Sequence, residues 1–141
     1  MKKLISLSAL IFLVISFFST NSIAADKKAQ ETLSKPSKIE VYYFHFTRRC
    51  VTCQAVETES QADIAALYPV QFKKGLITFK SVNLDEKTSE ALAKRCKAEG
   101  QALLVISGNK RFDLTEQAFM YAKNSPEKLK AELKKTINPL F

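Results

Sequence analysis

The sequence predicts an α/β domain with a central mixed β-sheet flanked by helices. Three observations lead to this prediction. Apolar, strand-like runs alternate with helical patterns, which favours parallel βαβ units. A Gly108-Asn109 turn joins two late strand-like runs, which adds an antiparallel hairpin at one edge. A Cys-x-x-Cys pair, Cys50 and Cys53, lies where the first apolar run passes into a helical pattern.

Residues 1–24 have the pattern of a secretory signal peptide. Two lysines precede a 15-residue apolar run, and Ser22-Ile23-Ala24 offers a small-residue cleavage site. The run is shorter than the roughly 20 apolar residues that a membrane-spanning helix needs. We therefore expect cleavage near Ala25, export to the periplasm or the extracellular space, and no stable membrane insertion after cleavage.

The rest of the chain is basic and suits one domain. The sequence has 22 Lys and Arg against 14 Asp and Glu, a net charge of +8, which falls to +6 when residues 1–24 are removed. Most of the lysines near the C-terminus lie on the outward face of a predicted helix, so charge alone predicts no nucleic-acid partner. We expect a flexible segment over residues 25–38 and the folded domain over residues 39–141.

The first predicted strand and helix flank the two cysteines. Residues 39–46 are β-branched and aromatic with almost no alternation, which is typical of a central strand buried on both faces. After it, apolar or small residues recur at steps of three or four and predict a helix that ends at Pro69. These residues are Cys53, Val56, Ser60, Ile64 and Leu67.

The second half of the chain predicts three more strands and two helices. Residues 76–84 favour a strand, and residues 88–99 a short helix stopped by Gly100. Residues 103–106 and 110–114 form the predicted hairpin. Residues 115–123 fit no single pattern.

A final helix is predicted from the C-terminal pattern. Ser125 can cap it, Pro126 fits its first position, and the apolar face consists of Leu129, Leu133 and Ile137.

The chain resembles the thioredoxin-like family over residues 39–137. The resemblance rests on the strand followed by Cys50-Val-Thr-Cys53, on the second strand ending at Ser81-Val-Asn-Leu-Asp85, and on residues 97–106 running into the Gly108-Asn109 turn. It implies a thioredoxin-like fold with dithiol chemistry, in a small exported bacterial member of the family.

Three positions depart from the family's pattern. Arg49 stands where a tryptophan usually precedes the first cysteine, and Phe44 stands where an acidic residue is commonly buried beneath the disulfide. The family's cis-proline, which shapes the edge that binds substrate, has Gln101 or Ala102 in its place. The last departure puts substrate docking and redox behaviour in question.

The residues themselves predict a nucleophile and a resolving thiol. Cys50 lies at a helix N-terminus and follows Arg48 and Arg49, so we expect a lowered thiol pKa, although both arginines also fit solvated loop charges. Cys50 would attack a partner's disulfide, and Cys53, one turn further on, would release the partner. This chemistry needs no cofactor, and the expected partners are protein or small-molecule thiols and disulfides, including an unidentified redox partner.

Two residues could handle the proton that Cys53 must lose. Glu57 lies one helical turn beyond Cys53, and His45 is the only histidine in the chain. His45 fits a buried core residue better, and Glu57 fits an exposed carboxylate equally well. The third cysteine, Cys96, fits a small buried apolar side chain on the short helix.

Three functions are open at this point. The first is an exported thiol-disulfide oxidoreductase, an enzyme. The second is a metal-binding module for copper or zinc, in which His45 or Cys96 joins the two sulfurs, although a closed zinc site needs four ligands. The third is a redox-inactive interaction domain with a structural disulfide. In the chain-entropy model, however, a disulfide that closes so short a loop stabilises the fold little.

Overall fold

The computed structural model describes residues 38–141. The predicted signal peptide, and the predicted flexible segment apart from Lys38, lie outside the described residues. In chain order the elements are β1 (Ile39–His45), α1 (Val51–Leu67), α2 (Pro69–Lys73), β2 (Ile77–Asn83), α3 (Glu90–Cys96), β3 (Ala102–Ser107), β4 (Lys110–Asp113), α4 (Thr115–Tyr121) and α5 (Pro126–Ile137), with 3₁₀ turns at Lys87–Ser89 and Asn138–Leu140. Within residues 38–141, the helices are all too short or too polar to cross a membrane.

The four strands form one mixed sheet in the order β2-β1-β3-β4. β1 pairs parallel with β2 and antiparallel with β3, and β4 pairs antiparallel with β3. This confirms the predicted mixed sheet with an antiparallel hairpin at its edge. The parallel part is the single unit β1-α1-β2, because β3 already runs opposite to β1.

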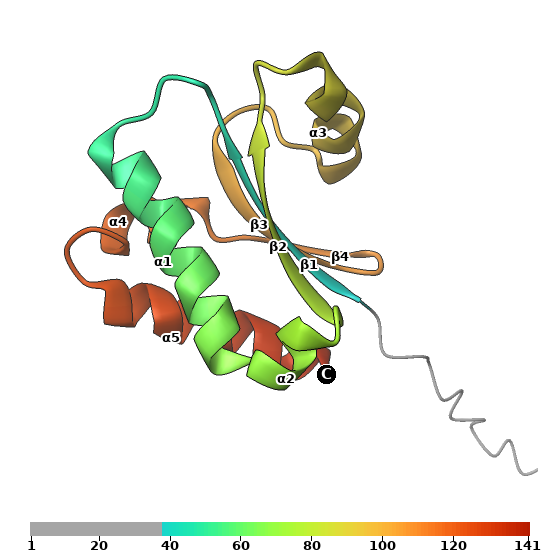
Figure 1. The fold of residues 1–141 in the computed structure, drawn as a ribbon, viewed down its shortest axis with the longest axis vertical. Helices are drawn as coiled ribbons and strands as arrows, with labels where there is room; N and C mark the ends of the chain where they lie inside the picture. The colour runs from blue at the N-terminus through green and yellow to red at the C-terminus, as the bar shows by residue number, and fades with distance from the viewer. Residues whose placement is uncertain (1–37) are drawn as a thin grey trace, which may run out of the picture. The chain divides into compact units, whose positions relative to one another are not determined.

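Helices cover both faces of the sheet, which explains why most positions of β1 are apolar (Figure 1). On one face, Val41 and Tyr43 pack in a cluster that includes buried residues of α1, α4 and α5. On the other face, Tyr42 and Phe44 pack against α3. Because successive side chains of a strand point to opposite faces, an interior strand covered on both sides favours apolar residues at nearly every position.

The helix boundaries on the α1 face agree with the sequence, with two additions. Pro69 follows the end of α1 as predicted, but it also begins α2, where its missing N–H and fixed φ suit the first helical position. The ambiguous residues 115–123 contain α4. In α5 the predicted apolar face is fully buried, while Ser125 occupies the N-cap without a side-chain hydrogen bond.

The predicted end of the helix over residues 88–99 needs a correction. A 3₁₀ turn comes first, and α3 then ends at Cys96 rather than beside Gly100. Lys97 takes the left-handed backbone conformation, with φ 54° and ψ 44°, and the N–H of Ala98 donates to the carbonyl of Ala93. The chain therefore leaves the helix three residues before the glycine, through a conformation that glycine usually adopts.

Candidate functional site

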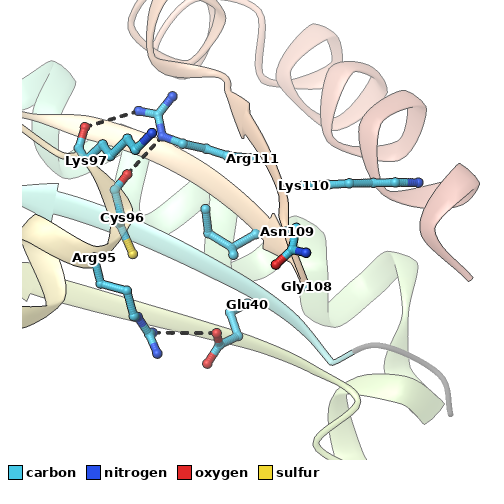
Figure 2. A pocket seen from close by; sticks show the side chains of 9 residues that line it. Glu40, Arg95, Cys96, Lys97, Gly108, Asn109, Lys110 and Arg111 are labelled. Carbon is cyan, nitrogen blue, oxygen red and sulfur yellow. Dashed lines mark hydrogen bonds and ion pairs between the residues drawn. The ribbon is translucent and has the colours of Figure 1, made fainter. Parts of the chain in front are cut away.

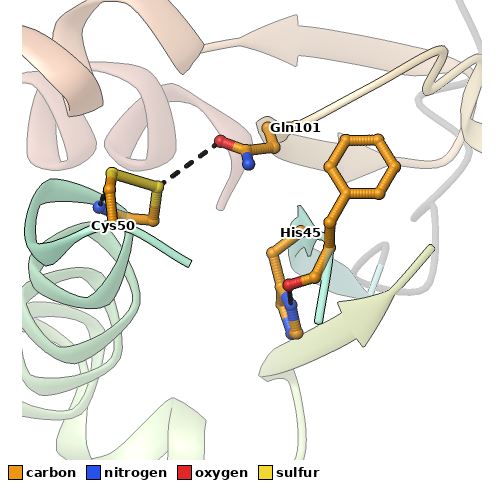
Figure 3. Close-up of a disulfide and its surroundings, with 5 residues drawn as sticks. His45, Cys50 and Gln101 are labelled. Carbon is orange, nitrogen blue, oxygen red and sulfur yellow. Dashed lines mark hydrogen bonds between the residues drawn. A yellow bond between two sulfur atoms is a disulfide. The ribbon is translucent and has the colours of Figure 1, made fainter. Parts of the chain in front are cut away.

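The Cys50–Cys53 pair is a disulfide at the start of α1. Their Cα atoms lie 5.1 Å apart. Cys50 is the N-cap residue, with extended backbone, and its Sγ accepts a hydrogen bond of 3.2 Å from the N–H of Cys53 (Figure 3). Cys50 is exposed, whereas Cys53 is only 4% exposed. A partner in solution can therefore reach one sulfur much more easily than the other.

The loop that leads into Cys50 is tied to the end of β2. The carboxylate of Asp85 accepts a hydrogen bond of 2.8 Å from the N–H of Thr47, and the side-chain amide of Asn83 donates to the hydroxyl of Thr47 at 3.0 Å. The Thr47 bonds lower the pKa of the Asp85 carboxyl, because they stabilise its charged form. These contacts fix where the chain turns from β1 towards the disulfide.

Arg49, the residue before Cys50, forms an ion pair with Glu57. Both side chains are about three-quarters buried. The pair joins the loop to the second turn of α1, and it offsets part of the positive charge that the sequence places beside Cys50. Arg48 is exposed and makes no ion pair within residues 38–141.

Gln101 contacts the buried sulfur from the neighbouring loop. Its Oε1 lies 3.6 Å from Cys53 Sγ, and Figure 3 shows the amide directed at the disulfide. The next residue, Ala102, is buried and begins β3 opposite Phe44. Residues 38–141 contain no cis peptide bond. A flexible amide thus occupies the place where the resemblance implies a proline ring.

The amide changes what Cys53 meets in its two redox states. In the disulfide the sulfur carries no hydrogen, so the approach of Oε1 is a simple contact. When Cys53 is a thiol, its S–H can donate to that oxygen. The sequence marked Gln101 as part of the substrate edge but did not predict this contact.

His45 lies at the end of β1 and is 8% exposed. Its Nδ1 donates to the carbonyl oxygen of Phe46 at 2.9 Å, and in Figure 3 the ring lies apart from the disulfide. Within residues 38–141 no hydrogen bond joins His45 to either cysteine. Its surroundings are those of a core histidine, and its role in proton transfer stays a prediction.

Tyr43, on β1, carries a polar group that sequence reasoning missed. Its hydroxyl is buried and has no hydrogen-bond partner among the described residues. Burial raises the pKa of Tyr43 to about 12, with the positive charge of Arg49 acting in the opposite direction. The phenol therefore stays neutral near the site, and the apolar run that predicted β1 gave no hint that this hydroxyl would lack a partner.

Cys96 lies far from this chemistry, on the α3 face of the sheet. It is a free thiol, 3% exposed, and burial is the largest cause of its raised pKa. This matches the predicted small buried side chain. In the described part of the chain, no three His, Cys, Asp or Glu side chains are grouped so that they could hold a metal ion.

Comparisons with known proteins found likenesses among solved structures. No family model and no curated protein matches it. Among solved structures, it is similar to the germline-specific thioredoxin Deadhead of Drosophila melanogaster, with 20% identity, a TM-score of 0.45, and coverage of 70% of this chain and 81% of that one. It is also similar to a malarial protein, with 21% identity, a TM-score of 0.44, and coverage of 70% and 97%.

The topology itself carries the assignment. A parallel β1-α1-β2 unit is followed by an antiparallel β3-β4 hairpin in the order β2-β1-β3-β4. Helices lie on both faces, and a Cys-x-x-Cys disulfide caps the helix that follows the interior strand. This is the arrangement that the sequence resemblance implied. The chain therefore has the thioredoxin-like fold that the resemblance implied.

Proposed function

We propose that the protein is an exported thiol-disulfide oxidoreductase that acts through Cys50 and Cys53. The observation that carries the proposal is the asymmetry of the pair. Cys50 is exposed at a helix N-terminus, where backbone N–H groups favour a thiolate, and Cys53 is buried behind it. A structural disulfide gains nothing from such an asymmetry, whereas exchange needs one reachable sulfur.

The reaction consists of two successive thiol–disulfide exchange steps. The Cys50 thiolate attacks one sulfur of a partner's disulfide, forms a mixed disulfide and expels the partner's other sulfur as a thiolate. Cys53 then loses its proton and attacks Cys50 Sγ, which releases the second partner sulfur and closes the Cys50–Cys53 disulfide. Two electrons pass to the partner, and the reverse sequence oxidises a partner dithiol.

The surrounding side chains act on different steps of this exchange. Gln101 Oε1 can accept the S–H of Cys53, which favours the reduced pair and holds the resolving thiol protonated until the mixed disulfide forms. Arg49 supplies positive charge near the entering thiolate, moderated by Glu57. The proton acceptor for Cys53 is assigned to solvent or to Glu57 once its ion pair opens.

The proposed setting is outside the cytosol, with protein or small-molecule thiols and disulfides as partners. The signal-like pattern of residues 1–24 supports export, and an oxidising compartment allows the disulfide to persist. The intact mass of the exported protein tests this part. A mass that starts near residue 25 is expected, and a full-length mass in the membrane fraction would contradict it.

A glutathione redox titration with thiol alkylation and mass spectrometry tests the chemistry. We expect Cys50 and Cys53 to interconvert at a potential above about −270 mV while Cys96 stays reduced. A Cys53→Ser variant should accumulate a mixed disulfide with glutathione at Cys50, and a Cys50→Ser variant should not.

The other two functions predict different results in the same titration. A structural disulfide would resist reduction down to about −300 mV or below. A metal site would show a stoichiometric ion that protects both thiols from alkylation. Either result would replace the oxidoreductase proposal.

A further inference from the structure

A second candidate site lies at the opposite end of β1 from the disulfide. It is a cavity of about 340 Å³, which is within the size range of small-molecule sites. Glu40, the second residue of β1, lines it, about 17 Å along the strand from His45. Figure 2 shows the side chains that surround it. The cavity is lined by Glu40, Arg95, Cys96, Lys97, Ile106, Gly108, Asn109, Lys110 and Arg111.

The lining is strongly basic. Four cationic side chains and one carboxylate give it a net formal charge of +3. Lys110 extends away from the other labelled side chains in Figure 2, so it belongs to the rim. Arg95, Lys97 and Arg111 are the other three cations of the lining.

Two of these cations are held in place by the fold. Arg95 Nη2 donates to the Tyr42 hydroxyl at 2.9 Å and lies 3.6 Å from Glu40 Oε2. On the other side of the cavity, Arg111 Nε donates to the carbonyl of Cys96 at 2.9 Å (Figure 2). Its Nη2 lies 3.0 Å from Asp113 Oδ2. Guanidinium groups fixed in this way lose little freedom when they bind a ligand.

Lys97 supplies an independent observation. It is the only non-glycine residue with a positive φ among residues 38–141. The helix end would be less strained with glycine there. Its side chain is exposed and makes no ion pair within the described part of the chain. Lys97 thus combines an unfavourable backbone conformation with a positive charge that has no ion-pair partner among the described residues. Backbone strain of this kind is concentrated at functional sites.

We propose that this cavity binds a small anion with two or more phosphate or carboxylate charges. Arg95 and Arg111 donate to its oxygens from two sides, and Lys97 closes over it at the mouth. Planar, forked guanidinium groups match both kinds of oxyanion. The site is separate from the disulfide and does not depend on the proposed redox activity.

Calorimetric titration of the purified protein with pyrophosphate and with citrate, at constant ionic strength, tests the proposal. We expect one saturable site for at least one of the two anions. A Lys97→Gly variant should bind about tenfold more weakly, since it loses one charge-assisted hydrogen bond. Lys94→Ala is the matched control, because it removes one positive charge from the exposed side of α3 and does not line the cavity.

The Lys97→Gly variant also separates binding from folding. Glycine accepts the left-handed conformation, so the unliganded variant should melt at the same temperature as the parent or higher. A second readout uses Cys96, which is the free thiol of the oxidised protein and lines the cavity. Bound anion should slow its alkylation in the parent and in Lys94→Ala, but not in Lys97→Gly.

The outcomes are distinct. Binding of pyrophosphate alone identifies a phosphate-bearing ligand, and binding of citrate alone a carboxylate-bearing one. The proposal is overturned if neither anion gives a saturable isotherm, or if Lys94→Ala weakens binding as much as Lys97→Gly does.

Discussion

The two helices that carry cysteines give them opposite surroundings. Cys50 caps the start of α1 and is exposed, whereas Cys96 is the last residue of α3 and is 3% exposed. Unpaired N–H groups at a helix start favour a thiolate, and unpaired carbonyls at a helix end disfavour one. Burial raises the pKa of Cys96 further. The helix end at which a thiol lies and the depth of its burial therefore decide its reactivity.

The largest expected effect is the difference in alkylation rate between these two thiols. In the reduced protein at pH 7, iodoacetamide should modify Cys50 on the order of 100-fold faster than Cys96, because only Cys50 is both exposed and favoured as a thiolate. Peptide mass spectrometry over a time course measures both rates in one sample. Equal alkylation rates for Cys50 and Cys96 would show that helix position and burial do not set the reactivity of these thiols.

Replacing Cys96 tests whether this buried thiol has a packing role alone. A Cys96→Ala variant should lose about 1.5 kcal/mol of unfolding free energy at pH 7, because it leaves a small cavity under α3. Its disulfide potential should equal that of the parent. Urea denaturation and the glutathione titration measure the two quantities, and a shifted potential would show that Cys96 takes part in the redox chemistry.

The same variant gives a pH test. Because burial raises the pKa of Cys96, the unfolded thiol loses its proton first, from about pH 8.5 upward. The parent's stability should therefore fall as pH rises above that value, and the variant should lack this fall. The difference in unfolding free energy between the parent and Cys96→Ala should therefore narrow from pH 7 to pH 10. A constant gap would show that the thiol titrates equally in both states.

A smaller effect is expected from the amide beside Cys53. Gln101→Leu removes the acceptor for the S–H of the reduced state, a hydrogen bond worth about 1 kcal/mol, which corresponds to a potential lower by about 20 mV. The exposed Gln61 on α1 offers a matched control, Gln61→Leu. A potential that rises instead would mean that the amide NH₂ group, and not the oxygen, faces the sulfur.

The smallest effect concerns the charge beside Cys50. Glu57→Gln frees Arg49 from its ion pair, so the pH midpoint of Cys50 alkylation should fall by about 0.3 units, within the range of partly exposed ion pairs. Arg49→Gln should raise the midpoint, and Glu59→Gln serves as the control on the same helix. If neither Arg49→Gln nor Glu57→Gln changes the pH midpoint, the start of the helix alone sets the reactivity of Cys50.

The parts of the fold that follow from local pattern could be predicted from the sequence. The largely apolar run 39–46 identified the interior strand, and the spacing of Leu129, Leu133 and Ile137 identified the buried face of α5. The Gly108-Asn109 turn located the hairpin. In each case the residues that set the structure are neighbours along the chain.

The contacts that complete the site could not be predicted in this way. The Arg49–Glu57 pair depends on how the loop folds back on α1, and the contact between Gln101 and Cys53 joins residues 48 positions apart. The left-handed Lys97 was missed because Gly100 offered a more usual helix stop. The Arg111 bond to the Cys96 carbonyl holds this helix end in place, and no local pattern predicts it.

The outer strand β4 has a consequence for solubility. An edge strand presents unpaired N–H and C=O groups that can recruit the edge of a second molecule and start fibril growth. β4 is only four residues long, and it carries Lys110, Arg111 and Asp113. Charged side chains and a short length are two of the features that keep an edge strand from pairing with another molecule. The short, charged strand β4 is therefore a poor template for the edge of a second molecule.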